Sequence, residues 1–164
     1  ALTYNRLFCY RRFTIYDEDG QEIIHMVATF VLMDRESRKV HPVEPEIVAP
    51  YQSEFSKKLL RGPKYAELEE AISKDYHVRF YDLDMNGHVN NSKYLDWVFE
   101  VMGADFLTNH IPKKINLKYV KEVRPGGMIT SSYELNGLES NHQVTSDGDI
   151  NAQAKITWQE IKKD

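Results

Sequence analysis

Residues 80–91 read FYDLDMNGHVNN, and the change of pattern within them decides the fold of the chain. Residues 76–80 alternate between apolar and polar, as in a β-strand, whereas apolar residues recur at helical spacing after the stretch. Acidic, amide and imidazole side chains lie between these two patterns. Asp84, Asn86 and His88 are two residues apart, so in extended backbone they would project to the same side. We therefore predict a polar site at a strand-to-helix junction.

The residues that follow predict one α+β unit. Apolar residues at helical spacing run from Tyr94 to Phe106, with Asn90 or Asn91 as N-cap and Pro112 as the breaker of a long helix. Alternating residues predict further strands: 115–123, 128–135, around 142–145, and 149–158. A single helix wrapped by one curved antiparallel sheet is the most economical packing of this order. That packing is the hot-dog fold.

The N-terminal residues predict a hairpin and a connector. Aromatic and β-branched residues over 7–17 and 22–34 predict two strands joined by a turn. Neither face of the second strand is clearly polar, so we expect it to be covered on both sides. Repeated prolines over 35–50 predict an extended surface connector. Helical spacing over 64–73, with a proline near the first turn, predicts a short helix.

Composition limits the class of protein. With 41% hydrophobic and 28% charged residues the chain is typical of a globular protein, and no apolar run reaches the length of a membrane span. The net charge of -4 argues against a nucleic-acid binder. Cys9 is the only cysteine, which excludes an internal disulfide and fits the reducing cytoplasm. The histidines show no metal-ligand spacing, and the acidic stretches 17–20 and 147–151 do not match a calcium loop. We expect no metal.

A second acid can reach the polar stretch. Glu122 ends the predicted strand 115–123, directly before a Pro-Gly-Gly turn. If that strand lies beside the helix N-terminus, Glu122 joins Asp84, Asn86 and His88. Two carboxylates in a semi-buried site push their pKa values apart, which leaves one suited to act as a base near neutral pH.

A purely structural reading of these residues stays open. Asn-Gly, as at 86–87, is a common turn dipeptide, and a polar cluster between a strand and a helix is often only a capped loop. Glu122 taken alone is typical of a solvated strand end. The local pattern by itself favours this reading.

The longer pattern reverses that preference. Residues 82–94, DLDMNGHVNNSKY, resemble the signature of the acyl-(acyl carrier protein) thioesterases, the plant-type fatty-acid chain terminators and their bacterial relatives. Residues 117–123, LKYVKEV, are similar to the family segment that carries its second catalytic acid. Residues 11–13, 32–34 and 37–39 resemble the end of the first hot-dog domain of that family. The likeness covers nearly the whole chain, and the middle motif is the most specific part.

The resemblance implies a tandem hot-dog protein. Residues 1–45 would be the last strands of an incomplete first domain, 46–74 a linker with a short helix, and 75–164 the second domain. Because the chain opens with Ala1 on residues that already read as strand, we expect it to be the later part of a longer protein. In the family, chain-length preference is implied to depend on a pocket in the first domain.

The resemblance also implies a reaction. It places function on Asp84, Asn86, His88 and Glu122, and implies hydrolysis of acyl carrier protein thioesters to free fatty acid without a cofactor. Plant members often have a cysteine just after the glutamate, where this chain has Val123. A mechanism in which carboxylates activate water therefore fits better than a Cys-His mechanism.

Two alternatives of different kinds remain. An acyl-CoA thioesterase can use the same fold, and a non-catalytic hot-dog domain can bind acyl thioesters as a sensor, although a binder needs no base. The predicted partner is an acyl carrier protein, which is acidic, and a homodimer through hot-dog pairing is possible. Basic residues, which are usually a solvated face, gather in two groups: Lys57, Lys58, Arg61 and Lys64; and Lys113, Lys114, Lys118, Lys121 and Arg124. The second group lies near the predicted site and is a candidate docking surface.

Overall fold

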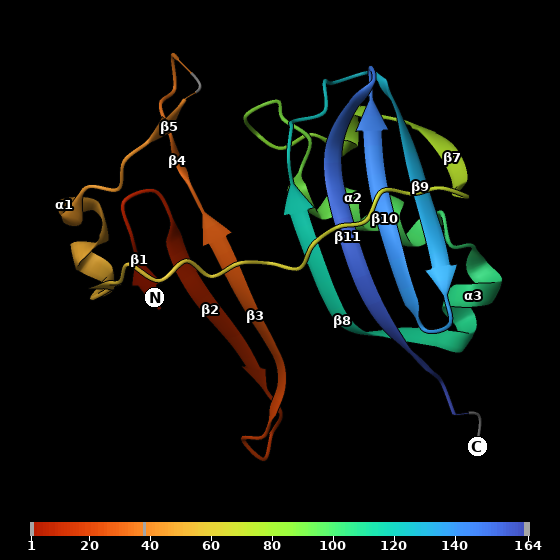
Figure 1. The fold of residues 1–164 in the computed structure, drawn as a ribbon, viewed down its shortest axis with the longest axis horizontal. Helices are drawn as coiled ribbons and strands as arrows, with labels where there is room; N and C mark the ends of the chain where they lie inside the picture. The colour runs from red at the N-terminus through yellow and green to blue at the C-terminus, as the bar shows by residue number, and fades with distance from the viewer. Residues whose placement is uncertain (1, 38, 163–164) are drawn as a thin grey trace. The chain divides into compact units, whose positions relative to one another are not determined.

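The computed structural model describes residues 2–37 and 39–162 (Figure 1). The chain divides into two compact units, Ala1–Arg61 and Gly62–Asp164. We refer to them as the N-terminal unit and the C-terminal unit and describe each by itself. The finer division into 1–45, 46–74 and 75–164 stays a prediction.

The N-terminal unit is built on the predicted hairpin, which the structure confirms. Its strands are β2 (Cys9–Tyr16) and β3 (Glu22–Phe30), and the sheet order is β3-β2-β1-β6, with β1 at Thr3–Tyr4 and β6 at Glu54–Phe55. In the turn, Asp17 Oδ1 accepts hydrogen bonds from the Asp19 and Gln21 N–H groups at 3.0 and 2.7 Å. The short strands β4 (Leu32–Met33) and β5 (Val40–His41) form a second sheet.

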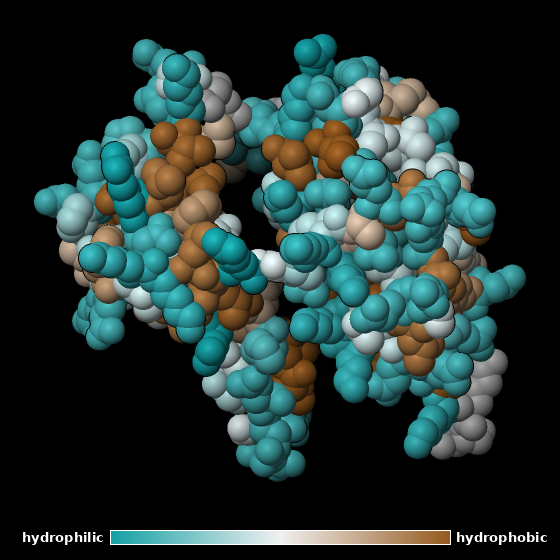
Figure 2. Space-filling view, viewed as in Figure 1, coloured by the Kyte–Doolittle hydropathy of each residue, from teal (hydrophilic) through white to brown (hydrophobic). Residues whose placement is uncertain are grey.

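The prediction that the second strand is covered on both sides is wrong for this unit. Consecutive residues of β3 are exposed, among them Ile24 at 56% and Val27 at 45%. Figure 2 shows the resulting apolar surface of the N-terminal unit. An apolar strand is buried only where another layer lies over it, and most of β3 has no such cover among the described residues of the N-terminal unit.

The helix predicted over 64–73 is also wrong. The N-terminal unit instead has a four-residue helix, α1 (Pro45–Val48), followed by the turn η1 (Ala49–Tyr51), within the predicted connector. Residues 64–68 have no regular structure, and β7 (Ile72–His77) begins where the helix was expected to end. β7 pairs with β9 from Ile72 opposite Tyr133 to His77 opposite Met128. This pairing between distant residues overrides the weak local preference for helix.

The C-terminal unit confirms the predicted α+β hot-dog fold. Its five-stranded antiparallel sheet has the order β7-β9-β10-β11-β8. The further strands are β8 (His110–Tyr119), β9 (Met128–Asn136), β10 (Glu139–Ser146) and β11 (Asp149–Glu160). The helix α2 (Asn91–Glu100) lies behind β10 and β11 in Figure 1 and contacts β9 and β10. Its buried residues, Tyr94, Trp97 and Val98, pack into one core with inward-facing strand residues.

The predicted long helix is broken. α2 ends at Glu100, Gly103 adopts a φ of 84°, and a separate helix, α3 (Ala104–Asn109), follows. Pro112 does not stop a helix, because it lies inside β8 opposite Trp158, beside a register irregularity. β8 is an edge strand of the sheet, and edge strands with bulges are the places where a sheet tolerates proline.

A buried hydrogen-bonded chain links β10 and β11. The Trp158 Nε1–H donates to Ser140 Oγ at 2.7 Å, and Ser140 Oγ lies 2.7 Å from His142 Nε2. Since Ser140 accepts from Trp158, its own proton can go to His142 Nε2, which requires a neutral imidazole. Burial lowers the pKa of His142 to about 4.

We expect the stability of the C-terminal unit to fall with acid through this histidine. Its pKa is lower in the folded than in the unfolded state, so its contribution is complete above about pH 6.5 and is lost as the pH falls toward 4. The loss should be on the order of 3 kcal/mol. Chemical denaturation between pH 4 and 7.5 measures it, and His142→Gln should flatten the profile. The same replacement at the exposed His25 should not, and an unchanged slope in His142→Gln would contradict the assignment.

Candidate active site

The polar stretch folds as a closed loop. Leu83 and Val89 form an isolated antiparallel bridge, and the Asp84 N–H donates to the His88 carbonyl oxygen at 2.7 Å. Gly87 adopts a φ of 75°, a conformation that glycine reaches without strain. The prediction that alternation in extended backbone aligns the side chains is therefore wrong. Closure of the loop gathers them instead.

Asp84 organises this loop. Its Oδ1 accepts hydrogen bonds from the backbone N–H groups of Asn86 at 2.8 Å and His88 at 3.1 Å. The His88 N–H is the largest cause that lowers the pKa of Asp84, and the Asn86 N–H, the Asn86 side-chain amide and the charge of His88 act in the same direction. Asp84 is therefore ionised at neutral pH and lies close to both Asn86 and His88. The structure brings these three predicted residues together.

Asp82 anchors the start of the loop, and sequence reasoning missed this role. It is buried at the end of the turn η2 (Phe80–Asp82), and its carboxylate accepts from the Arg79 N–H at 2.8 Å and the guanidinium at 3.0 Å. Burial would raise the pKa of Asp82, but these hydrogen bonds lower it overall. Its carbonyl oxygen also accepts from the Asn90 N–H at 2.8 Å. The spacing of Arg79 and Asp82, three residues apart, was the sequence signal that could have indicated this ion pair.

Asn90 joins the loop to the helix, as predicted. Its Oδ1 accepts from the Ser92 N–H at 3.0 Å, which caps α2. The N–H groups of the first turn of a helix have no partners within the helix and carry partial positive charge. The loop of Asp84, Asn86 and His88 therefore leads directly into a helix end that favours negative charge.

Glu122 approaches the same helix end by a separate route. β8 ends at Tyr119, so Glu122 lies beyond the strand and not at its end. The next residue, Val123, donates its N–H to the Tyr94 hydroxyl at 3.2 Å, and the Tyr119 hydroxyl donates to the Asn91 carbonyl oxygen at 2.9 Å. Burial raises the pKa of Tyr94, and the charge of Glu122 raises it further. These contacts lead to the first turn of α2, and a meeting of Glu122 with His88 stays a prediction.

Tyr94→Phe tests the link between Glu122 and the helix. The variant keeps the buried ring and its edge-to-face contact with Tyr119, whose centroid is 5.2 Å away, but leaves the buried Val123 N–H without its acceptor. We expect a loss of about 1–3 kcal/mol of unfolding free energy, measured by urea denaturation. Tyr133→Phe, on β9, is the matched control. Equal stability of Tyr94→Phe and the parent chain would contradict the importance of this bond.

The site is more open than the semi-buried cleft predicted. In the C-terminal unit, Asn86, His88 and Glu122 are exposed, and Met85 in the middle of the loop is 98% exposed. A small cleft of about 30 Å³ lies beside Glu122, lined by residues that include Lys121, Arg124 and Asn151. Across residues 2–37 and 39–162, no group of three or more His, Cys, Asp or Glu side chains is placed to hold a metal ion.

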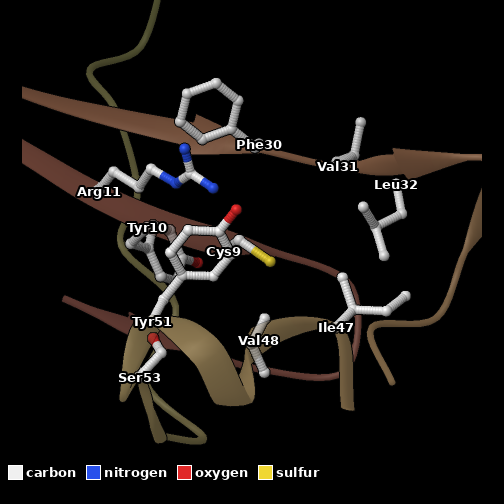
Figure 3. A pocket seen from close by; sticks show the side chains of 10 residues that line it. All are labelled: Cys9, Tyr10, Arg11, Phe30, Val31, Leu32, Ile47, Val48, Tyr51 and Ser53. Atoms are coloured by element: carbon white, nitrogen blue, oxygen red, sulfur yellow. The ribbon is translucent and has the colours of Figure 1, made fainter. Parts of the chain in front are cut away.

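The N-terminal unit has an apolar cavity of about 270 Å³ that sequence reasoning missed (Figure 3). The Arg11 guanidinium lies between two aromatic rings, 5.4 Å from the centroid of Phe30 and 4.6 Å from that of Tyr51. Cys9 also lines this cavity. Cys9 therefore lies in the N-terminal unit, whereas the polar loop lies in the C-terminal unit. α1 and η1 form one wall, and neither element was predicted from the sequence.

Of the helices within the described ranges, none combines the length and hydropathy needed to cross a bilayer.

Comparison with known proteins bears on both units. Residues 65–160 match the model of the acyl-ACP thioesterase C-terminal domain, and residues 1–51 match that of the N-terminal domain. The chain is 27% identical over 141 residues to the chloroplastic oleoyl-acyl carrier protein thioesterase 2 of Arabidopsis thaliana, which is 77% of this chain and 37% of that protein. The chain thus spans well under half the length of this relative.

Comparison with solved structures agrees with the two family models. A provisionally assigned oleoyl thioesterase of Lactobacillus plantarum is 34% identical and superposes with a TM-score of 0.91, over 98% of this chain and 66% of that one. The 12:0-ACP thioesterase of Umbellularia californica, at 23% identity, shares the fold with a TM-score of 0.80 over 95% of this chain and 64% of that one. Since one family model covers more than half of the chain and the second covers most of the remainder, the chain belongs to the acyl-ACP thioesterase family.

Proposed function

We propose that this chain carries the catalytic loop of an acyl-ACP thioesterase, which hydrolyses acyl carrier protein thioesters and terminates fatty-acid synthesis. One observation carries the proposal: Asp84, Asn86 and His88 are gathered in a closed loop at the N-terminal end of α2, and Glu122 approaches the first turn of the same helix. Under this proposal, residues 1–45 end a first hot-dog domain and residues 75–164 form the second.

In the proposed mechanism Glu122 is the general base. It takes a proton from a water molecule, whose oxygen attacks the carbonyl carbon of the thioester. Asn86 and His88 orient the water and the substrate, and the N–H groups at the start of α2 stabilise the oxyanion. The carbon–sulfur bond then breaks, and His88 donates a proton to the departing thiolate. The products are a free fatty acid and the carrier thiol.

Asp84 suits a different role from Glu122. A carboxylate whose pKa is lowered by hydrogen bonds is a weak base at neutral pH. We assign it to hold the loop and to place a negative charge beside His88. The sequence left open which of the two acids is the general base, and we propose that it is Glu122.

A hydrolysis assay of the full-length protein tests the proposed function. Carrier-bound acyl thioesters of graded chain length should be cleaved, and matched CoA thioesters should be cleaved with a lower kcat/KM. Faster cleavage of the CoA series would favour the acyl-CoA thioesterase. Binding of acyl thioesters without hydrolysis of either series would favour the sensor. A cytoplasmic location and pairing of two chains through hot-dog sheets stay proposals.

We further propose that the basic residues of β8 and the segment after it contact the acidic carrier. Lys118 is exposed on β8, whereas Lys121 is paired with Asp149, so Lys118 is the clearer position to change. Lys118→Glu is expected to raise KM for a carrier-bound substrate several-fold and to leave KM for the matched CoA thioester unchanged. Lys58→Glu, in the N-terminal unit, is the control. An unchanged KM for the carrier substrate would dismiss this surface.

A further inference from the structure

Asn151 is the extra residue of a β-bulge. Along the β10–β11 ladder Val144 pairs with Ala152 but Thr145 pairs with Ile150, so Asn151 has no opposite residue. Asn151 and Ala152 are consecutive and both are buried, at 1% and 0% exposure, which the alternation of a regular strand facing solvent on one side does not give. Bulges break the alternation in this way and re-aim a side chain.

The re-aimed side chain holds the segment that carries Glu122. Asn151 Nδ2 donates to the carbonyl oxygens of Lys121 and Glu122, at 3.3 and 3.4 Å. The Asn151 carbonyl oxygen accepts from the N–H groups of Val120 at 2.8 Å and Lys121 at 3.2 Å. The two side-chain bonds are long and individually weak, but together the four bonds tie one buried residue to three consecutive residues beyond β8.

Ser146 fixes the orientation of this amide. Its hydroxyl donates to Asn151 Oδ1 at 2.8 Å, which leaves the Nδ2 protons for the two carbonyl oxygens. The opposite orientation would place Oδ1 against those carbonyl oxygens and lose both bonds. The amide therefore has one favourable orientation, and in that orientation Nδ2 binds the backbone of Lys121 and Glu122.

We infer that Asn151 is the positioning residue for Glu122, an inference that depends on the proposed role of Glu122 as base. Glu122 lies between two held peptide groups. Asn151 binds the Lys121 carbonyl oxygen in the peptide group before Glu122 and the Glu122 carbonyl oxygen in the one after it, whose Val123 N–H donates to Tyr94. Fixing the backbone on both sides limits where the carboxylate can move. A misplacement of about 1 Å in a catalytic group can cost about 10²-fold in rate.

The test is a double-mutant cycle in the full-length protein on a carrier-bound acyl thioester. Asn151→Ala is expected to lower kcat about 10- to 100-fold with KM unchanged, because the base is misplaced and substrate binding is not touched. In a Glu122→Gln background the same change should have no further effect on kcat, since no base remains to be positioned. Gln153→Ala, which removes an amide from the same strand, should leave kcat near the parent value.

A merely structural role gives a different result. Asn151→Ala would then lower the melting temperature and reduce kcat by the same factor with either Glu122 or Gln at position 122. That result, or a folded Asn151→Ala variant with full kcat, overturns the inference. Should Asn151→Ala not fold, Ser146→Ala serves instead. It leaves Asn151 in place but releases its amide, and it should lower kcat several-fold only when Glu122 is present.

The cycle also separates this inference from the proposed function. If Glu122→Gln alone keeps full activity, the role of Glu122 fails, and the positioning role fails with it. If Glu122→Gln is inactive while Asn151→Ala and Ser146→Ala keep the parent kcat, only the positioning role fails.

Discussion

Replacing Glu122 with Gln is expected to lower kcat for a carrier-bound acyl thioester about 10³-fold, within the range that a positioned general base contributes. The amide keeps the size and shape of the carboxylate but cannot accept a proton from water. KM should change little, because Glu122 is assigned to the attacking water and not to the acyl chain. Steady-state hydrolysis with a thiol-detecting reagent measures both constants.

Two comparisons make the Glu122 result decisive. Glu160→Gln, at the exposed last residue of β11, removes a charge of the same kind and should leave kcat unchanged. The Glu122→Gln variant should also unfold at the same denaturant concentration as the parent, because an exposed side chain contributes little to stability. Full activity in a folded Glu122→Gln variant would remove this residue from the mechanism.

Asp84→Ala is expected to lower kcat about 10²- to 10³-fold, for a different reason. The N–H groups of Asn86 and His88, now held at 2.8 and 3.1 Å, would lose their common acceptor, so the loop that gathers the polar side chains would open. KM should rise as well, since Asn86 and His88 are assigned to orient the substrate. Steady-state kinetics of the variant, with its melting temperature, measures these effects.

Asp84→Asn separates the shape of the loop from its charge. The amide oxygen can accept the same two N–H groups, so we expect this variant to keep more activity than Asp84→Ala. Equal losses in the two variants would show that the negative charge takes part in the reaction directly, as a base or nucleophile. A fully active Asp84→Ala variant would exclude both roles.

The proposed roles of the two acids rest on structural contacts, because their residue types give no distinction. Asp84 lies in a loop whose own N–H groups lower its pKa, and these groups are two and four residues away in the sequence. Glu122 is held through contacts with Asn151 and, by way of Val123, with Tyr94, each about thirty residues distant. A sequence read locally can suggest the first arrangement. It has no means to reveal the second.

The errors made from sequence have related causes. The helix predicted over 64–73 gave way to β7, and the long helix predicted through Phe106 was interrupted at Gly103. In the first case strand pairing with β9 outweighed a local pattern, and in the second a single glycine in the left-handed region ended the regular path. The spacing of apolar residues indicates which side chains can be buried. It does not indicate which other element of the chain will pack against them.

The sequence by itself determined the strands β9, β10 and β11 of the C-terminal unit, the Asn90 cap of α2 and the polar composition of the loop that precedes it. These features depend on alternation, on one capping side chain and on one turn, all of which are encoded within a few neighbouring residues. Only the tertiary structure decided that a bulge at Asn151 holds the Glu122 segment, because that contact requires β11 to lie beside β8 in a particular register. It also decided that Asp82 is buried beneath Arg79, since burial is a property of the packed chain.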